Sequence, residues 1–169
     1  MWRRISLTVG LATVVVGLDQ WSKAWALRDL PRLGREGITV VAGYFNLAYA
    51  ENRNAAFGIL QGLPYEARRV VLTGFAIAAI AVLMGSLLTG RIQRQFTAAA
   101  TGLILGGAIG NVIDRVQLGF VVDFIVWHVT ERFYWPTFNV ADSGIVVGVF
   151  MLLWLSYWVE RREAARAAA

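Results

Sequence analysis

The chain has 169 residues, of which 57% are hydrophobic and only 16% charged, whereas soluble proteins average about 25% charged residues. Its mean hydropathy of +0.56 indicates an integral membrane protein rather than an ordinary soluble enzyme or a disordered chain. It contains no cysteine, which excludes a disulfide scaffold, a thiol nucleophile, an iron–sulfur cluster and a cysteine zinc site, and its single histidine argues against a metal site built from several histidines. The net charge is +5, and arginines cluster where apolar runs end, which is typical of membrane proteins rather than nucleic-acid binders.

Four segments approach the length of about 20 apolar residues that a spanning helix needs. We predict one domain over residues 1–169, α-helical, with membrane spans over residues 5–27, 70–90, 96–116 and 140–159. The first segment also resembles a signal peptide, because Met1-Trp2-Arg3-Arg4 is basic and Ala24-Trp25-Ala26 mimics a cleavage site. Polar residues from Asp19 onward separate the apolar run from that site and favour a retained span.

The arginines predict the orientation of the spans. They precede the first span, fill the link between the second and third, and follow the fourth: Arg3, Arg4, Arg91, Arg94, Arg161, Arg162 and Arg166. Four spans place these groups on one face, which the positive-inside rule assigns to the cytoplasm. Both termini are then cytoplasmic, and residues 28–69 and 118–138 lie outside, although the longer of these segments also carries arginines. Within it, the β-branched and aromatic residues 37–49, punctuated by glycine, predict two short strands.

Charged residues inside apolar segments are costly, so each is a candidate for function. Asp19 and Lys23 are four residues apart and can pair on one face of a helix, which favours a structural role. Asp114 and Arg115 follow the small-residue run 106–111, which allows close helix packing. For these two, structural and functional interpretations are about equally supported.

Asp123 and Asp142 are harder to explain structurally. Asp123 is flanked on both sides by apolar residues, and Asp142 is the third helical residue after a plausible N-cap, Asn139. The N-terminus of a helix favours the ionised form of a carboxyl group. Two carboxylates that meet near a membrane surface can share one proton, so that one activates water as a base and the other acts as an acid.

Other functional readings fit less well. Ser143 with His128 lies in no nucleophile elbow, and Ser22 and Lys23 are adjacent on one helix, so their side chains diverge by about 100°. A small proton-coupled transporter remains the alternative, because intramembrane acids also mark proton relays. The absence of an internal repeat in the sequence counts against it.

Five blocks of the sequence together resemble a known family. They are Asp19-Gln20-Trp21-Ser22-Lys23, Asn52-Arg53-Asn54-Ala55-Ala56-Phe57-Gly58, Gly106-Gly107-Ala108-Ile109-Gly110-Asn111-Val112-Ile113-Asp114-Arg115, Val121-Val122-Asp123-Phe124 and Phe138-Asn139-Val140-Ala141-Asp142-Ser143. In this order they resemble the bacterial lipoprotein signal peptidases (signal peptidase II), which are integral membrane aspartic proteases. Asn54 stands where that family usually has glycine, although asparagine tolerates positive φ better than most residues.

The resemblance implies four transmembrane helices with a small extracytoplasmic β-sheet, in the bacterial inner membrane, with the active site near its outer face. It implies an aspartic endopeptidase that cleaves prolipoproteins just before a diacylglyceryl-modified cysteine, with no cofactor or metal. We expect membrane lipids as its surroundings and a monomeric chain. The family's catalytic pair corresponds to Asp123 and Asp142. The residues that match polar positions around the site are Asn52, Asn111, Arg115 and Asn139, and those that match more structural positions are Asp19, Lys23 and Asp114.

Overall fold

Four long helices and one small sheet form the computed structural model, which describes residues 1–34, 37–54, 62–129 and 133–167. The helices are α1 (Trp2–Asp29), α2 (Tyr65–Leu88), α3 (Gln95–Gln117) and α4 (Val140–Ala167), and a short 3₁₀ helix, η1 (Leu30–Leu33), follows α1. All four long helices are long and apolar enough to cross a membrane. The chain is therefore a multi-pass membrane protein of the predicted fold class.

The helices overlap the predicted spans but differ from them at the ends. α2 begins at Tyr65, five residues before the predicted span, and Glu66 occupies its first turn, where the helix dipole favours an acidic side chain. α4 continues through Ala167, well past residue 159. Hydropathy marks the apolar part of a helix, whereas backbone hydrogen bonds set where the helix ends.

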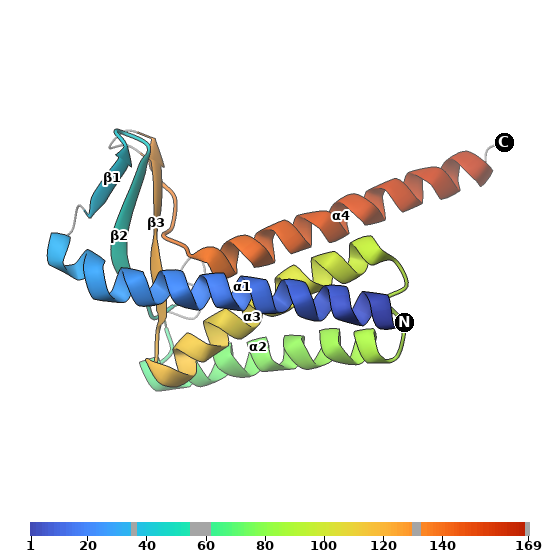
Figure 1. The fold of residues 1–169 in the computed structure, drawn as a ribbon, viewed down its shortest axis with the longest axis horizontal. Coiled ribbons are helices and arrows are strands. Elements are labelled where there is room, and N and C mark those ends of the chain that lie inside the picture. The colour runs from blue at the N-terminus through green and yellow to red at the C-terminus, as the bar shows by residue number, and fades with distance from the viewer. Residues whose placement is uncertain (35–36, 55–61, 130–132, 168–169) are drawn as a thin grey trace.

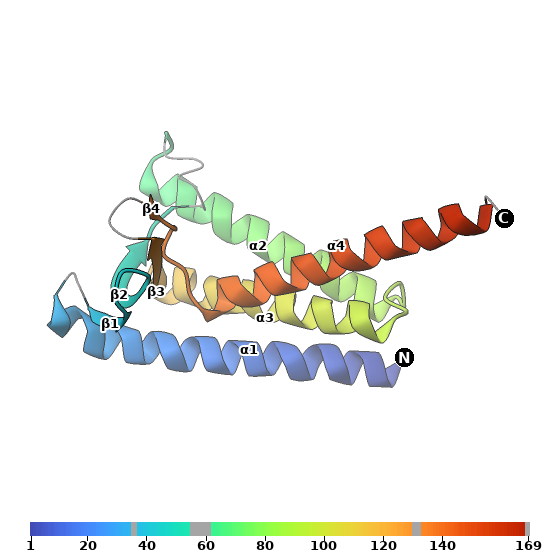
Figure 2. The ribbon, with the colours of Figure 1, turned by 90° about the horizontal axis from the view of Figure 1, so that it is seen from above.

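α3 is the central helix of the bundle. Figure 2 shows it between α1 and α2, and α4 also packs on it. Glycines allow these close contacts, because a Cβ on Gly102 or Gly106 would lie 2.7 or 2.8 Å from a backbone oxygen of α1. On another face of α3, a Cβ on Gly107 would collide with the backbone oxygen of Ala141 in α4. The small-residue run therefore permits close helix packing, as its composition predicted.

The sheet stands at one end of the bundle, with its strands running across the helix axes (Figure 1). Its strands are β1 (Ile38–Val41), β2 (Phe45–Asn52), β3 (Val121–Val129) and β4 (Phe133–Tyr134), antiparallel in the order β1-β2-β3-β4. The two strands predicted over residues 37–49 correspond to β1 and β2. β3, which joins those two strands to β4, was not predicted.

The sheet is anchored to the bundle beneath it. Ala26, Leu30, Val122 and Phe124 form a buried cluster where α1 and η1 meet β3. Phe138 exchanges backbone hydrogen bonds with Ile125, at 2.9 and 3.1 Å. The chain therefore runs alongside β3 immediately before α4 begins, which brings the start of α4 to the strand that carries Asp123.

Candidate active site

Asp123 lies on β3, with its side chain fully buried. In the β2–β3 pairing it is opposite Ala50, and Asn52, two residues further along β2, lies on the same face of the sheet. Asn52 is therefore a diagonal neighbour, and its Nδ2 donates to Asp123 Oδ2 at 2.9 Å. The long-range pairing of two strands thus brings together two of the sequence-predicted site residues.

Asn139 connects Asp123 to the first turn of α4. Its side-chain Oδ1 accepts the backbone N–H of Asp142 at 2.9 Å, which is the N-cap hydrogen bond that the sequence predicted. Its Nδ2 donates to Asp123 Oδ1 at 2.7 Å. One buried amide therefore holds the carboxylate of Asp123 with one end and the backbone of Asp142 with the other.

Asn111 reaches the same site from α3. Its Nδ2 donates to Asp142 Oδ1 at 2.8 Å, and its Oδ1 lies 3.3 Å from Asn139 Nδ2. Arg115, one turn further along α3, is half-buried and donates to the backbone oxygen of Asn111 at 3.3 Å. Its guanidinium also interacts electrostatically with Asp142, Asp114 and Asp123. α3 thus supplies an amide to one carboxylate and a positive charge to the surroundings of both.

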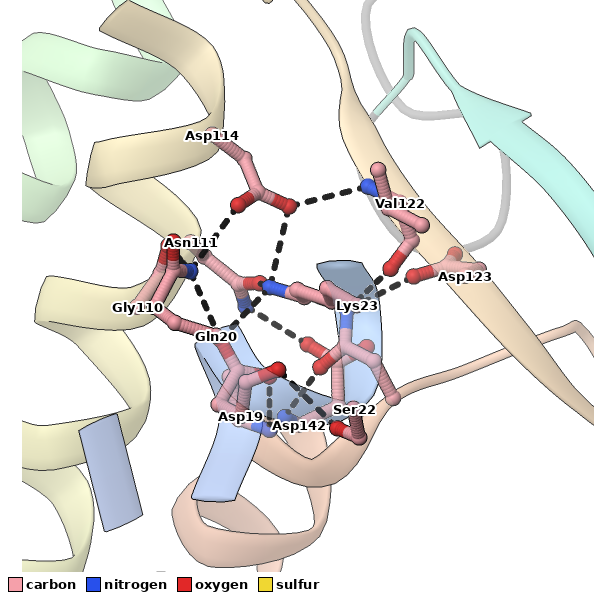
Figure 3. A network of polar contacts seen from close by, with 12 residues as sticks. Asp19, Gln20, Ser22, Lys23, Gly110, Asn111, Asp114, Val122, Asp123 and Asp142 are labelled. Carbon is pink, nitrogen blue, oxygen red and sulfur yellow. Dashed lines mark hydrogen bonds and ion pairs between the residues drawn. The ribbon is translucent and has the colours of Figure 1, made fainter. Parts of the chain in front are cut away.

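Asp19, Lys23 and Asp114 form a buried ion cluster next to these amides (Figure 3). The pair that the sequence spacing predicted is present, with Lys23 Nζ 2.8 Å from Asp19 Oδ2. Lys23 Nζ also lies 3.0 Å from Asp114 Oδ2, and Asp114 Oδ2 accepts the backbone N–H of Val122 at 2.9 Å. The ion cluster therefore joins α1, α3 and the start of β3.

Gln20 is a residue of this network that the sequence reasoning missed. Its Nε2 donates to Asp19 Oδ2 at 3.1 Å and to Asp114 Oδ1 at 3.0 Å. The available signal was a further polar side chain in the apolar first span, between two charged residues. A side-chain amide one residue from an intramembrane acid needs a hydrogen-bonding partner, and here it bridges two carboxylates.

Burial shapes the ionisation of the site. It raises the pKa of Asp123 to about 7, and the neighbouring charge of Asp142 adds to this effect. The hydrogen bonds from Asn52 and Asn139 act in the opposite direction, because they stabilise the carboxylate. Asp142 is half-buried and sits at the N-terminus of α4, where the helix dipole favours negative charge. The two carboxylates therefore occupy different environments, which is the arrangement that separates an acid from a base.

The serine-based alternatives find no support in the geometry. Ser22 Oγ donates to the backbone oxygen of Asp19 at 2.9 Å, and Ser143 Oγ donates to the backbone oxygen of Asn139 at 3.0 Å. His128, on β3, stacks on the ring of Tyr134 with centroids 5.2 Å apart. Each hydroxyl thus bonds to its own helix backbone. Among the described residues, Asp123 and Asp142 with their amide partners are therefore the candidates for hydrolytic chemistry.

Comparison with known proteins matches most of the chain to one family. The sequence model of the family described as Signal peptidase (SPase) II matches residues 11–158. A lipoprotein signal peptidase of Syntrophotalea carbinolica is 43% identical over 148 residues, which cover 88% of each chain. One from Oleidesulfovibrio alaskensis is 38% identical over 142 residues, covering 84% of this chain and 88% of the relative.

Solved structures have the same fold. A bacterial membrane enzyme determined at 2.3 Å resolution superimposes with a TM-score of 0.77 at 28% sequence identity, covering 90% of this chain and 88% of that one. A second structure, also described as a bacterial membrane enzyme, gives a TM-score of 0.73 at 28% identity, covering 88% and 91%. The fold of this chain thus also occurs in solved bacterial membrane enzymes.

Proposed function

The chain belongs to the signal peptidase II family, and from this premise we propose that it is an aspartic endopeptidase with Asp123 and Asp142 as its catalytic pair. As a member of the family it removes signal peptides from prolipoproteins. The proton-coupled transporter, which the buried charges had left open, has no support among the relatives. The aspartic mechanism and the residue roles below are our proposal.

The observation that carries the proposal is the amide of Asn139. It binds Asp123 Oδ1 at 2.7 Å and the backbone N–H of Asp142 at 2.9 Å. Residues from a strand and a helix that are 19 positions apart in the sequence are thereby held at one place. Buried charges that served only the fold would not require two acids to share an amide in this way.

The environments of the two acids support different roles. Asp142, at a helix N-terminus and bonded to Asn111, is the base, and Asp123, with its pKa raised to about 7, is the acid. Asp142 takes a proton from water while the hydroxyl oxygen bonds to the scissile carbonyl carbon. The C–N bond then breaks as the proton of Asp123 passes to the leaving nitrogen, so the pair ends with one proton, as it began. Neighbouring amides and Arg115 are the donors available to a developing oxyanion.

The location of the site fits the substrate we propose, a prolipoprotein cleaved just before a diacylglyceryl-modified cysteine. Asp123 lies on β3 and Asp142 in the first turn of α4, and Figure 1 shows β3 and the start of α4 together at one end of the helix bundle. A site at a membrane surface admits both the acyl chains from the bilayer and the peptide from the aqueous side. We place this end at the outer face of the bacterial inner membrane, with both termini in the cytoplasm, and expect a monomer surrounded by membrane lipids.

Cleavage of a synthetic diacylglyceryl prolipoprotein peptide by detergent-purified protein tests the proposal. Asp123→Asn and Asp142→Asn should each abolish turnover, because an amide neither accepts the proton from water nor delivers one to the leaving nitrogen. Both variants should insert and fold, since asparagine is nearly isosteric with aspartate and adds no buried charge.

Two matched variants serve as controls. Ser143 lies beside Asp142 on α4, and His128 lies on β3 with Asp123. Ser143→Ala and His128→Ala therefore alter α4 and β3 without changing the acids. They should keep substantial activity. Loss of all activity in Ser143→Ala, with activity surviving in either Asn variant, would overturn the aspartic mechanism.

A further inference from the structure

The ammonium of Lys23 is completely coordinated inside the protein. Its side chain is 4% exposed, and its Nζ contacts Asp19 Oδ2 at 2.8 Å, Asp114 Oδ2 at 3.0 Å and Asn111 Oδ1 at 3.0 Å. An ammonium has three N–H donors, so each donor has one acceptor. Two of these acceptors are the acids of the ion cluster, and the third belongs to the amide that contacts Asp142 (Figure 3).

This third contact sets which way the Asn111 amide points, together with Asn139 Nδ2, which lies 3.3 Å from the same oxygen. Lysine is a donor only, whereas a carboxamide has one acceptor end and one donor end. With Lys23 on one side, the oxygen of Asn111 must face the ammonium and the NH₂ group must face away from it. The NH₂ group then meets Asp142 Oδ1 at 2.8 Å. Without Lys23, an amide rotated by 180° would present its oxygen to a carboxylate.

Asp19 binds the backbone of α4 immediately before Asp142. Its Oδ1 accepts the N–H of Ala141 at 2.9 Å, one residue before Asp142. The carboxylate is wedged against α3, because a Cβ on Gly110 would lie 2.5 Å from Asp19 Oδ2. Asp19 therefore fixes the position of the first turn of α4 relative to α1.

We propose that the Asp19–Lys23 pair positions Asp142 for catalysis, with Lys23 orienting its side chain through Asn111 and Asp19 holding its backbone through Ala141. This inference rests on the proposed function, in which Asp142 reacts with water. It assigns the pair a role beyond the structural one that its helical spacing predicted. Both are positioning residues, since neither contacts the reacting atoms in this scheme.

A test must distinguish an effect on the position of Asp142 from the cost of leaving a buried charge without its partner. Charged groups face the ion cluster from every element packed around it: Asp19 and Lys23 from α1, Asp114 and Arg115 from α3, Asp123 from β3 and Asp142 from α4. Removing Lys23 alone would leave Asp19 and Asp114 without their cation, which destabilises a buried site strongly. A charge-balanced change at Asp19 and Lys23 leaves only Asp114, and not both acids, without its cation.

The double variant Asp19→Asn/Lys23→Met removes one negative and one positive charge and leaves the net charge unchanged. The asparagine oxygen can still accept the N–H of Ala141, whereas methionine offers no donor to Asn111. We expect kcat, normalised to the folded fraction, to fall at least about tenfold, with KM changed less than about twofold. The acidic limb of the pH–rate profile should move to higher pH, because a carboxylate that loses a donor holds its proton more tightly.

Thr8→Val is the matched control. Thr8 is a buried polar residue on α1 that donates to the backbone oxygen of Ala98 on α3 at 2.9 Å, about three helical turns before Asp19. This variant should lose thermal stability while keeping the wild-type kcat and pH profile. Any general loosening of the α1–α3 contact would appear in it as well.

If the double variant does not fold, Asp19→Asn/Lys23→Gln keeps the same charge balance and places the shorter glutamine at position 23. Its amide keeps a donor but ends one atom short of the lysine nitrogen, so it should show a smaller shift of the pH profile in the same direction. A wild-type kcat and pH profile in either folded variant would overturn the positioning role. If Asp142→Asn retains activity, the proposed function itself fails. If Asp142→Asn is inactive and Asp19→Asn/Lys23→Met behaves as wild type, only the positioning role fails.

Discussion

Asp123 should make the stability of the protein depend on pH. Its pKa is raised to about 7 by burial and by the charge of Asp142, whereas an aspartate in the unfolded chain titrates near pH 4. Between these values the folded state binds more protons than the unfolded state, so stability falls as pH rises from about 4 to about 7. The loss amounts to a few kcal/mol, at about 1.4 kcal/mol per pKa unit.

Thermal unfolding of wild type and Asp123→Asn between pH 4.5 and 8, in one detergent, measures this effect. The unfolding midpoint of wild type should fall relative to that of the variant as pH rises, and the difference should level off above about pH 8. Parallel curves over this range would show that Asp123 titrates with its ordinary pKa.

Arg68 and Asn54 should act as one unit next to Asp123. Arg68 Nη1 donates to Asn54 Oδ1, and its Nη2 donates to the backbone oxygen of Leu63 at 3.0 Å. The N–H of Asn54 in turn donates to Asn52 Oδ1 at 3.0 Å, and Asn52 binds Asp123. Asn54 thus offers Arg68 a side-chain acceptor. Glycine, the usual residue at this position in the signal peptidase II family, has no such acceptor.

A double-mutant cycle with Asn54→Gly and Arg68→Leu tests this coupling. Each single variant should lower kcat/KM a few-fold, and the double variant should be little worse than either, with a coupling energy of about 1 kcal/mol. Effects that simply add would mean that the two side chains act independently.

At the scale of single residues, the sequence singled out the polar side chains that the structure brings together, but not the partner of each. Asp123 and Asp142 stood out because apolar surroundings make an acid costly, and Asn139 was recognisable as an N-cap from local sequence alone. The role of the Asn139 amide in joining both acids depends on the β3–Phe138 pairing. Local patterns carry no information on such a contact between distant segments.

At the scale of the helices, the glycine stripe on α3 sets how closely α1 approaches. A Cβ on Gly106 would lie 2.7 Å from the Cβ of Val15 and 2.8 Å from the backbone oxygen of Ala12. Because backbone is involved, the helices must separate to accommodate even one methyl group. Gly106→Ala should therefore destabilise the protein by about 1–3 kcal/mol, the usual cost of overpacking.

Gly74→Ala on α2 is the matched control, since a Cβ at this position would have no neighbouring atom within 4 Å. Alanine there should be neutral or stabilise the helix by roughly 0.5–1 kcal/mol. The unfolding midpoints of both variants in detergent give the comparison. Equal midpoints for the two variants would show that the α1–α3 contact tolerates separation.

β3 shows why one element escaped prediction. Residues 121–129 form an apolar run rich in valine and interrupted by Asp123, and a short apolar run does not distinguish a strand from a buried helical segment. The β-branched residues were the usable signal. Its pairing with β2, about 70 residues earlier in the chain, is a tertiary feature. By contrast, the helices follow from hydropathy over about 20 residues, which a sequence reports directly.

At the scale of the whole molecule, the basic groups gather at the end of the bundle opposite the sheet. Figure 1 shows the N-terminus, the α2–α3 link and the C-terminal end of α4 on that side. Arg4 Nη1 donates to the backbone oxygens of Ile92 and Gln93, at 3.2 and 2.7 Å, which ties the N-terminus to the link. The structure thus brings together the arginine groups from which the orientation was inferred.

From the positive-inside rule we expect the sheet and the two acids on the outer side of the membrane. Reporter fusions after Arg94 and Arg162 should report the cytoplasm, and a fusion near Gly43 should report the outer side. The chain has no cysteine, so single-cysteine variants provide a second measurement in the full-length protein.

Tyr44 is exposed at the turn between β1 and β2, and Gln93 is exposed in the α2–α3 link. In intact spheroplasts, a membrane-impermeant maleimide should label Tyr44→Cys and should leave Gln93→Cys unlabelled until the membrane is permeabilised. Permeabilised cells control for reactivity, since both cysteines should then be labelled. Labelling of Gln93→Cys alone in intact cells would show that the orientation is the reverse of the predicted one, with the acids at the cytoplasmic face. A prolipoprotein anchored in the outer leaflet could not then reach Asp123 and Asp142.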